Sequence, residues 1–258
     1  MPNHIQNVIT FGADVPQERL DEVFSRILSL DDSTPPTQFF DFNKLIPMPK
    51  PLGIESSTNT EPAILLYRLV KGPKKNVDIS AERNALAGLR RIFSQAGISF
   101  DQEDAVSRFL KTEEGQKLFE LGKKSYFNQL SYSAPNWYDW CIHNWGTKWN
   151  SYSNKVDTAN RTLTFQTAWA CPTPIVAALS DAFPDVEFVW RYADEDFGYN
   201  TGVFTYRGGE MDYTEFEGGS DEGRDMYAVC WGVDGCMYKD SDGHWQRYDC
   251  DSCPNKCY

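Results

Sequence analysis

The alternation of apolar and polar residues predicts a strand, a helix and a second strand in the first fifty residues. Residues 5–12 (IQNVITFG) are rich in β-forming side chains and end at Gly12, which is typical of a strand. Pro16 stands where a helix can begin, and the apolar residues after it recur at helical spacing as far as Leu28. Residues 39–46 favour a second strand, and the proline-rich stretch that follows would end it.

The next hundred residues predict mainly helices. Residues 63–70 form a short apolar run that periodicity alone leaves open between helix and strand. Apolar residues at helical spacing recur over 83–96 and again over 111–130. No long linker closes this block off, so we interpret residues 50–150 as a helical insertion within a single domain that spans 1–258.

The alternation of strand and helix resumes in the second half of the chain. We predict strands at 161–169, 185–192 and 226–231, a helix at 175–183 and a hairpin over 202–216. Strand–helix–strand, insertion, strand–helix–strand is the outline of a split β-α-β sheet. The sequence therefore predicts an α+β fold, a ferredoxin-like antiparallel sheet with a large helical insertion and a cysteine-rich C-terminal extension at 226–258.

Two segments of the chain resemble a known family. They are the opening PNHIQNVITFG with DFNKLIPMPKPL, and the string WCIHNWGTKWN at 140–150, in which rare residue types stand at fixed offsets. In these segments the chain resembles the YubB-like proteins of phages and conjugative plasmids. The resemblance extends loosely over 161–206, and it implies a ferredoxin-like domain and a phage or plasmid origin. It implies no reaction, and the acidic and cysteine-rich parts lie outside it.

The same tryptophan-rich string is the first candidate binding motif. Its candidate residues are Trp140, Asn144, Trp145, Thr147, Lys148 and Trp149. Aromatic rings at this density could stack on a base while Lys148 meets a phosphate, as in a nucleotide or small-molecule binding protein. The same rings could instead pack the helical insertion onto the sheet, which is the commoner use of buried tryptophan. Both interpretations stay open.

The net charge of −12 is concentrated in the last third of the chain. Residues 181–225 carry 13 acidic against 3 basic residues, whereas residues 1–180 carry 19 of each. We expect Asp194, Glu195, Asp196, Asp221 and Glu222 to lie on one outward face that binds a basic surface of a host protein. An acidic field disfavours direct, non-specific DNA binding. The alternative is a solvated surface that keeps the protein soluble.

Five of the seven cysteines fall after position 229. Cys236, Cys250, Cys253 and Cys257 could supply the four thiolates of a structural zinc site, with His244 as a substitute ligand. An odd number of cysteines in a chain without a recognisable secretion signal argues against a disulfide framework. Reduced thiols or a single disulfide are the alternatives to zinc.

The sequence contains no recognised catalytic motif, and it has no apolar run long enough to cross a membrane. We therefore expect a cytoplasmic protein that acts by binding and is not an enzyme. The function we predict is that of a phage or plasmid accessory protein that binds a basic surface of a host protein, with counter-defence as its purpose. The alternatives are a nucleotide or small-molecule binding protein and an unrecognised metal-dependent enzyme.

Overall fold

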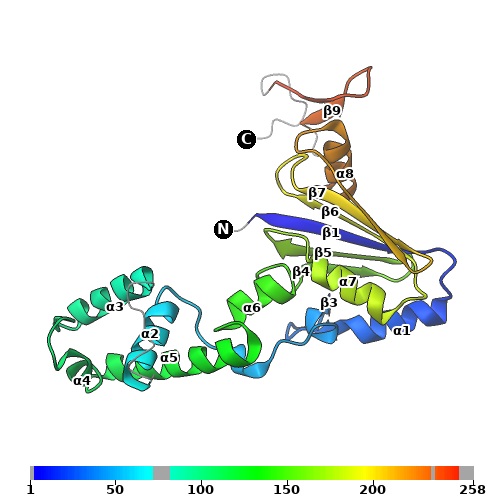
Figure 1. Ribbon diagram of the computed structural model, residues 1–258. Coiled ribbons are helices and arrows are strands. Elements are labelled where there is room, and N and C mark those ends of the chain that lie inside the picture. Colours follow the sequence, from blue (N-terminus) through cyan, green and yellow to red (C-terminus); the bar gives the residue numbers. More distant parts are fainter. Residues whose placement is uncertain (1–2, 72–81, 234–235, 250–258) are drawn as a thin grey trace. The chain divides into compact units, whose positions relative to one another are not determined.

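The computed structural model describes residues 3–71, 82–233 and 236–249, which form two compact units (Figure 1). The sheet unit comprises Met1–Pro47 and Asn144–Tyr258, and the helical unit comprises Met48–His143. We expected one domain over 1–258 with an insertion at about 50–150. The helical unit has a hydrophobic cluster of its own, and the single-domain interpretation stays a prediction.

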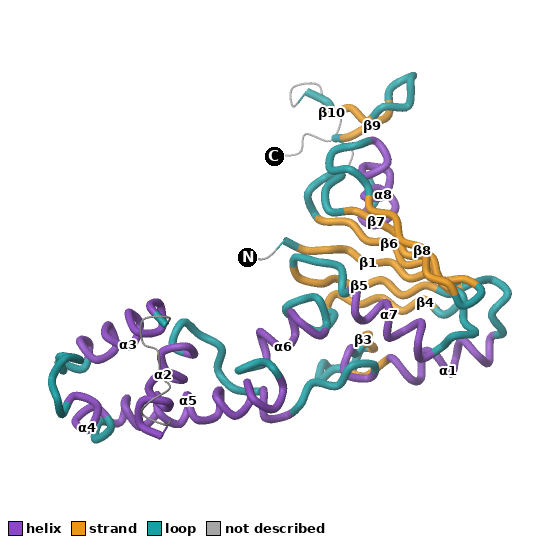
Figure 2. Tube along the Cα trace, viewed as in Figure 1, coloured by secondary structure: helices purple, strands orange, loops and turns teal. Residues whose placement is uncertain are grey.

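The sheet unit is built on a six-stranded antiparallel sheet (Figure 2). Its elements in chain order are β1 (His4–Phe11), α1 (Gln17–Ile27), β2 (Leu28–Leu30), β3 (Gln38–Phe40), the 3₁₀ helix η1 (Phe42–Lys44), β4 (Tyr152–Asp157), β5 (Thr162–Ala168), α7 (Thr173–Ala182), β6 (Phe188–Asp194), β7 (Thr201–Arg207), β8 (Glu210–Glu215), α8 (Asp221–Trp231), β9 (Met237–Lys239) and β10 (Trp245–Arg247). The strand order is β4-β5-β1-β6-β7-β8. The first four strands, with α1 and α7 as their crossovers, have the order of a split β-α-β sheet, which confirms the predicted ferredoxin-like fold.

Helices α1 and α7 cover the apolar face of this sheet. Alternate residues of β1, beginning with Ile5, point to that face and are buried. Phe11 at the end of β1 meets Phe24 of α1 edge-on, with ring centroids 5.4 Å apart. On the same face Tyr206 of β7 donates a hydrogen bond to the carbonyl of Pro184, just after α7 (O···O 3.1 Å). The helices therefore hold the sheet from one side.

The centre of the sheet unit is aromatic, with a buried polar network inside it. Trp190 is fully buried, and its ring centroid lies 6.1 Å from that of Phe40 and 5.5 Å from that of Phe165. The indole N–H of Trp190 donates to Oδ1 of Asn7 (3.0 Å), and Nδ2 of Asn7 donates to Oγ1 of Thr167 (3.0 Å). Because these buried polar atoms are paired, they carry no desolvation penalty for an unmade hydrogen bond.

The helical unit packs its helices around apolar side chains. Its elements are the 3₁₀ helix η2 (Lys50–Leu52), α2 (Thr60–Lys71), α3 (Arg83–Gln95), α4 (Ala105–Phe109), α5 (Glu113–Tyr132) and α6 (Trp137–Asn144). The apolar run at 63–70 is thus helical. Leu66, Leu89 and Phe93 are fully buried members of the core cluster. None of the helices in the described part of the chain combines the length and the apolarity that a bilayer crossing requires.

Two predicted strands differ from the structure. The strand expected at 39–46 ends at Phe40, because the carboxylate of Asp41 accepts a hydrogen bond from the backbone N–H of Asn43 (3.0 Å) and begins η1. The strand predicted at 226–231 is wrong, since these residues belong to helix α8. Ser220 caps that helix by accepting a hydrogen bond from the N–H of Gly223 (3.0 Å). The capping signal lies upstream of the segment that was interpreted as a strand.

Candidate functional site

One end of the sheet gathers exposed aromatic and acidic side chains. The strand register places the start of β1 beside the ends of β5 and β6, with His4 opposite Ala168 and Ile5 opposite Asp194. Around this end lie seven residues that we call the aromatic–acidic surface: Lys148, Trp149, Tyr152, Trp169, Glu195, Asp196 and Tyr199. The surface combines parts of both candidate sites that the sequence suggested separately.

Lys148 lies between two tryptophan rings. Its Nζ is 4.5 Å from the ring centroid of Trp149 and 5.2 Å from that of Trp169. Both rings are partly open to solvent, with 38% of Trp149 and 43% of Trp169 exposed. An ammonium group at these distances is attracted by the electron-rich faces of the rings. The two tryptophan rings therefore already hold one cation, the ammonium group of the protein's own Lys148.

A strained turn holds Trp169 in place. Trp169 has φ of 69° and Asn200 has φ of 46°, a left-handed conformation that side chains larger than glycine adopt at an energetic cost. Nδ2 of Asn200 donates to the carbonyl of Trp169 (3.2 Å) and to Oδ2 of Asp194 (3.3 Å). Asp194 is 5% exposed and also accepts a hydrogen bond from Asn3 (3.1 Å). The carboxylate of Asp194 thus orders the turn from inside.

The acidic and aromatic neighbours of this turn face solvent. Glu195 and Asp196 are exposed, and the N–H of Tyr199 donates to the carbonyl of Asp196 (3.0 Å). Tyr199 is 56% exposed, and its ring lies so close to Gly218 that a Cβ there would approach it to 2.8 Å. This contact explains the glycine at position 218. Glu195, Asp196 and Tyr199 therefore place carboxylates and a large aromatic ring side by side on an accessible surface.

Tyr152 and His4 complete the edge of the surface. The phenol oxygen of Tyr152 is 2.7 Å from Nδ1 of His4, and the Tyr152 ring meets Trp149 edge-on at 6.3 Å. Burial, and then the nearby charge of Glu195, raises the pKa of Tyr152 to about 12. Tyr152 is therefore a neutral hydrogen-bonding group at physiological pH.

Burial removes three residues of the tryptophan-rich motif from the candidate binding set. Trp140 is 6% and Trp145 is 3% exposed, and the indole N–H of Trp145 donates to the carbonyl of Ile46 (2.9 Å). Thr147 is buried and donates to the carbonyl of Ala168 (2.8 Å). These three side chains are therefore interior residues. Asn144, at the end of α6, and Lys148 are half-buried and Trp149 is exposed, so these three are the accessible residues of the predicted set.

The expectation that the acidic residues share one outward face is wrong. Asp194 points inward, and Asp221 accepts hydrogen bonds from His244 and from the N–H of Trp245. On β8, Asp212 and Glu215 lie on opposite faces of the strand, because successive side chains alternate. Glu222 is exposed in the first turn of α8. Of the predicted acidic residues, only Glu195 and Asp196 belong to the aromatic–acidic surface.

We predict that the β9–β10 hairpin is attached to α8 in a pH-dependent way, because His244 of the hairpin contacts Asp221 of α8. Nδ1 of His244 lies 2.6 Å from Oδ2 of Asp221, and this hydrogen bond is the main cause that raises the pKa of His244 and lowers that of Asp221. The histidine contribution is complete below its unfolded pKa of about 6.5 and is lost as the pH rises through the raised folded value. The aspartate contribution is present above its unfolded pKa of about 4 and is lost on acidification.

We therefore expect the hairpin to be held most firmly between about pH 4 and 6.5, and to loosen as the pH rises further. The NMR signal of the Trp245 indole N–H, which donates to Asp225 (2.9 Å), reports the attachment. In a His244→Gln variant the Trp245 signal should no longer change as the pH rises above about 6.5. In the control His143→Gln the signal should change as in the wild type. A wild-type indole signal that does not change between pH 6 and 9 would refute the expectation.

The predicted zinc site falls mainly outside the described residues, since Cys250, Cys253 and Cys257 lie there. Cys236 is disulfide-bonded, and a sulfur in a disulfide has no thiolate to offer a metal. Cys236 therefore leaves the predicted ligand set, and a disulfide was one of the alternatives. Within the described ranges, no three His, Cys, Asp or Glu side chains are arranged to hold a metal ion. The structural zinc that the sequence suggests stays a prediction, as does the role of the extension at 226–258.

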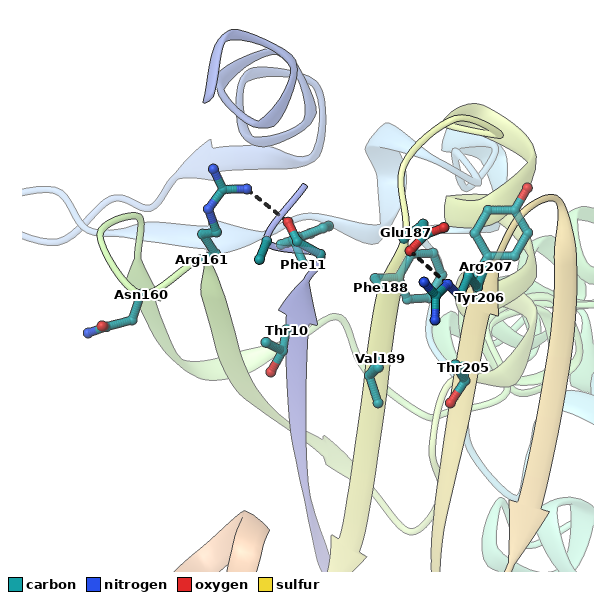
Figure 3. A pocket seen from close by; sticks show the side chains of 12 residues that line it. Thr10, Phe11, Asn160, Arg161, Glu187, Phe188, Val189, Thr205, Tyr206 and Arg207 are labelled. Carbon is teal, nitrogen blue, oxygen red and sulfur yellow. Dashed lines mark hydrogen bonds and ion pairs between the residues drawn. The ribbon is translucent and has the colours of Figure 1, made fainter. Parts of the chain in front are cut away.

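A cavity of about 450 Å³ lies at the other end of β1 (Figure 3). Arg161 at its edge donates hydrogen bonds to the carbonyls of Gly12 (2.9 Å) and Val15 (2.6 Å). Arg207 on the other side lies 3.4 Å from a carboxylate oxygen of Glu187. Both guanidinium groups are held by the protein, and Arg161 has the structural role of fixing the loop after β1.

The fold and the surface define a ferredoxin-like protein with a helical insertion and an aromatic–acidic surface at one end of its sheet. Residues 148–234, from just before β4 to just after α8, match the family model described as the ferredoxin-like domain in Api92-like protein. The crystal structure of the protein api92 from Yersinia pseudotuberculosis is similar over 85% of this chain and 100% of its own, at 14% identity and a TM-score of 0.32. No curated protein matches the chain. The predicted family resemblance is thus supported as far as an Api92-like ferredoxin-like domain.

Sequence reasoning missed three residues of the surface. Tyr152 lies between the tryptophan-rich motif and the strand predicted at 161–169, Trp169 ends that strand, and Tyr199 follows the strand predicted at 185–192. None of the three lies in a recognisable motif. One available signal was the position of Trp169 directly after an alternating strand and before Pro172, where a turn is expected. That Trp169 lies beside Lys148 depends on the pairing of distant strands, which the local pattern does not contain.

Proposed function

We propose that this protein acts by binding a partner protein through the aromatic–acidic surface, and that the partner presents a basic surface. The observation that carries the proposal is the place of Lys148 between the exposed rings of Trp149 and Trp169. A lysine or arginine of a partner can use the same ring faces, while Glu195 and Asp196 supply the opposite charge. Exposed tryptophan and tyrosine are the residue types that most often dominate binding energy at interfaces.

The charge of the surrounding segment favours a protein partner over a nucleic acid. Residues 181–225 carry 13 acidic and 3 basic residues, which repels phosphate backbones and attracts basic partners. The biological setting that we propose is that of a phage or plasmid accessory protein in the host cytoplasm, acting on a host protein in counter-defence. This setting rests on the family resemblance of the sequence and is an analogy.

A second function is supported by the same two rings. Trp149 and Trp169 could hold the base of a nucleotide, with Lys148 meeting its phosphate. The two functions make opposite demands on Lys148, since its charge repels a basic partner and attracts a phosphate. The metal-dependent enzyme remains the third alternative, and the described residues offer it no cluster of metal ligands.

The variant Lys148→Met separates the first two functions, because methionine keeps a long apolar side chain beside the rings and removes the charge. We expect the variant to bind a fluorescent deca-arginine peptide several-fold more tightly than the wild type, measured by fluorescence anisotropy, because a like charge has been removed. Weaker binding of the peptide by Lys148→Met would contradict the proposal. Tighter wild-type binding of a nucleotide that is lost in the variant would favour the second function.

The double variant Glu195→Gln/Asp196→Asn tests the acidic half of the surface. Each exposed charge pair contributes about 0.2–1 kcal/mol, so the peptide should bind roughly 2- to 30-fold more weakly at low salt. The matched control is Glu210→Gln/Asp212→Asn, which makes the same change in charge on β8, where both residues are exposed. Equal losses in the two double variants would show that net charge, and not this surface, determines binding.

A further inference from the structure

The helical unit differs in charge from the rest of the chain. Residues 48–143 carry 13 Lys and Arg against 11 Asp and Glu, although the whole chain has a net charge of −12. In this unit a cavity of about 420 Å³ lies between η2 and α5, and three of its lining residues are lysines, Lys50, Lys123 and Lys124. We propose that this cavity binds a nucleoside phosphate, with the phosphates at the lysines and the base against Phe127.

The cavity is held in a defined geometry by a buried amide. Asn128 is 5% exposed, and its Nδ2 donates to the carbonyl of Pro51 (2.9 Å) and to that of Pro135 (3.2 Å). The first bond ties the η2 turn, which carries Lys50, to helix α5, which carries the other lining residues. A site with a fixed wall loses little conformational freedom when a ligand binds. The volume of about 420 Å³ falls within the range of small-molecule sites.

Helical spacing places the charged and aromatic groups on one side of α5. Lys123 precedes Phe127 by four residues and Lys124 precedes it by three, and residues at these separations are neighbours on a helix surface. A ligand that reaches both groups therefore needs an anionic end and a flat apolar end close together. A nucleoside phosphate has both.

The ring of Phe127 is positioned and partly accessible. It meets Tyr67 edge-on at a centroid distance of 6.0 Å and Tyr126 at 5.7 Å, yet 49% of the residue is exposed. These two contacts orient the ring before a ligand arrives. Bases stack on such rings without a strong preference for sequence, because every base has an aromatic face.

The lysines provide a net positive wall. Nζ of Lys123 lies 3.9 Å from a carboxylate oxygen of Glu120, which is a long ion pair on the surface. Lys50 and Lys124 line the same cavity and are exposed. Lysine binds phosphate as a point charge, so the cavity does not require the bidentate geometry of arginine.

Isothermal titration calorimetry of the full chain with ATP and with tripolyphosphate tests the proposal. We expect ATP to bind with higher affinity than tripolyphosphate, because only ATP carries a base. Lys124→Gln should weaken binding of both ligands about tenfold, and Phe127→Leu should reduce the affinity for ATP to that for tripolyphosphate. The control Lys117→Gln removes a charge from the same helix, outside the cavity, and should leave both affinities unchanged.

Three results would overturn the proposal. They are the absence of binding at millimolar ATP, equal losses in Lys124→Gln and Lys117→Gln, and an unchanged preference for ATP in Phe127→Leu with an unchanged melting temperature. Lys148→Met should leave ATP binding intact, which separates this site from the aromatic–acidic surface. ATP binding that is lost in Lys148→Met would place the nucleotide at the tryptophans and not in this cavity.

Discussion

Replacing Trp190 with alanine should lower the free energy of unfolding of the sheet unit by about 3–5 kcal/mol. The side chain is fully buried between Phe40 and Phe165, so its removal leaves a cavity that the surrounding strands cannot fill. The change also removes the N–H donor that pairs with Oδ1 of Asn7 (3.0 Å), a residue that is itself fully buried. Since natural domains are stable by about 5–15 kcal/mol, this loss is a large part of the total.

Urea denaturation followed by circular dichroism measures the effect, and two variants divide it into its parts. Trp190→Phe retains most of the ring but not the donor, and should cost about 1–3 kcal/mol for the buried acceptor left unpaired on Asn7. Trp149→Ala removes an equally large side chain that is 38% exposed, so it should cost much less. If Trp190→Ala and Trp149→Ala were equally stable, the assignment of Trp190 to the centre of the core would be wrong.

The second large effect is expected for Gly122→Ala in helix α5. A Cβ at this position would lie 1.9 Å from the carbonyl oxygen of Ala63 and 2.4 Å from its carbonyl carbon, both of them backbone atoms of α2. Alanine favours a helix over glycine by about 1 kcal/mol, but the overlap can be relieved only if the two helices move apart. Overpacking of this kind typically costs about 1–3 kcal/mol, and a clash with backbone atoms belongs at or above the upper end of that range. The variant should therefore be less stable by roughly 2 kcal/mol or more.

Hydrogen exchange measures the loss of stability in Gly122→Ala and shows which helices it affects. Protection of the backbone amides of α2 and α5 should fall in Gly122→Ala, whereas Trp190→Ala should reduce protection in β1 and β6. Lys117→Ala, an exposed change on the same helix α5, is the control and should preserve protection in α2. Gly122→Ala with wild-type protection in α2 would show that the helices do not approach as closely as the structure places them.

The two kinds of variant serve different purposes in testing function. Trp190 and Gly122 stabilise the two units, so their replacement should impair binding only through unfolding. Lys148 and Phe127 lie at accessible positions of the two proposed sites, so their replacement should alter binding at unchanged stability. A loss of binding that accompanies a fall in melting temperature is therefore no evidence for either site.

Much of the fold was predictable from local pattern. The alternating residues of β1 and the amphipathic spacing of α1 both reflect one buried face, and the glycines at 208 and 209 have φ of 61° and 86°, the left-handed geometry of a tight hairpin turn. Helix α8 was missed because its cap, Ser220, precedes an acidic segment that was interpreted as surface charge. Helix α2 was left open because a short apolar run has the same appearance in a buried strand and a buried helix.

The sequence by itself determined the ferredoxin-like alternation of strands and helices, the helical insertion and the uneven charge, because each of these features depends on residues that are close together in the chain. Only the tertiary structure decided which side chains of the tryptophan-rich motif are accessible. Trp145 and Trp149 stand four positions apart, yet 3% of the first and 38% of the second is exposed. The difference arises because Trp145 is covered by Phe42 and bonded to the carbonyl of Ile46, about a hundred positions earlier in the chain. Burial is set by such distant contacts, and no local pattern contains them.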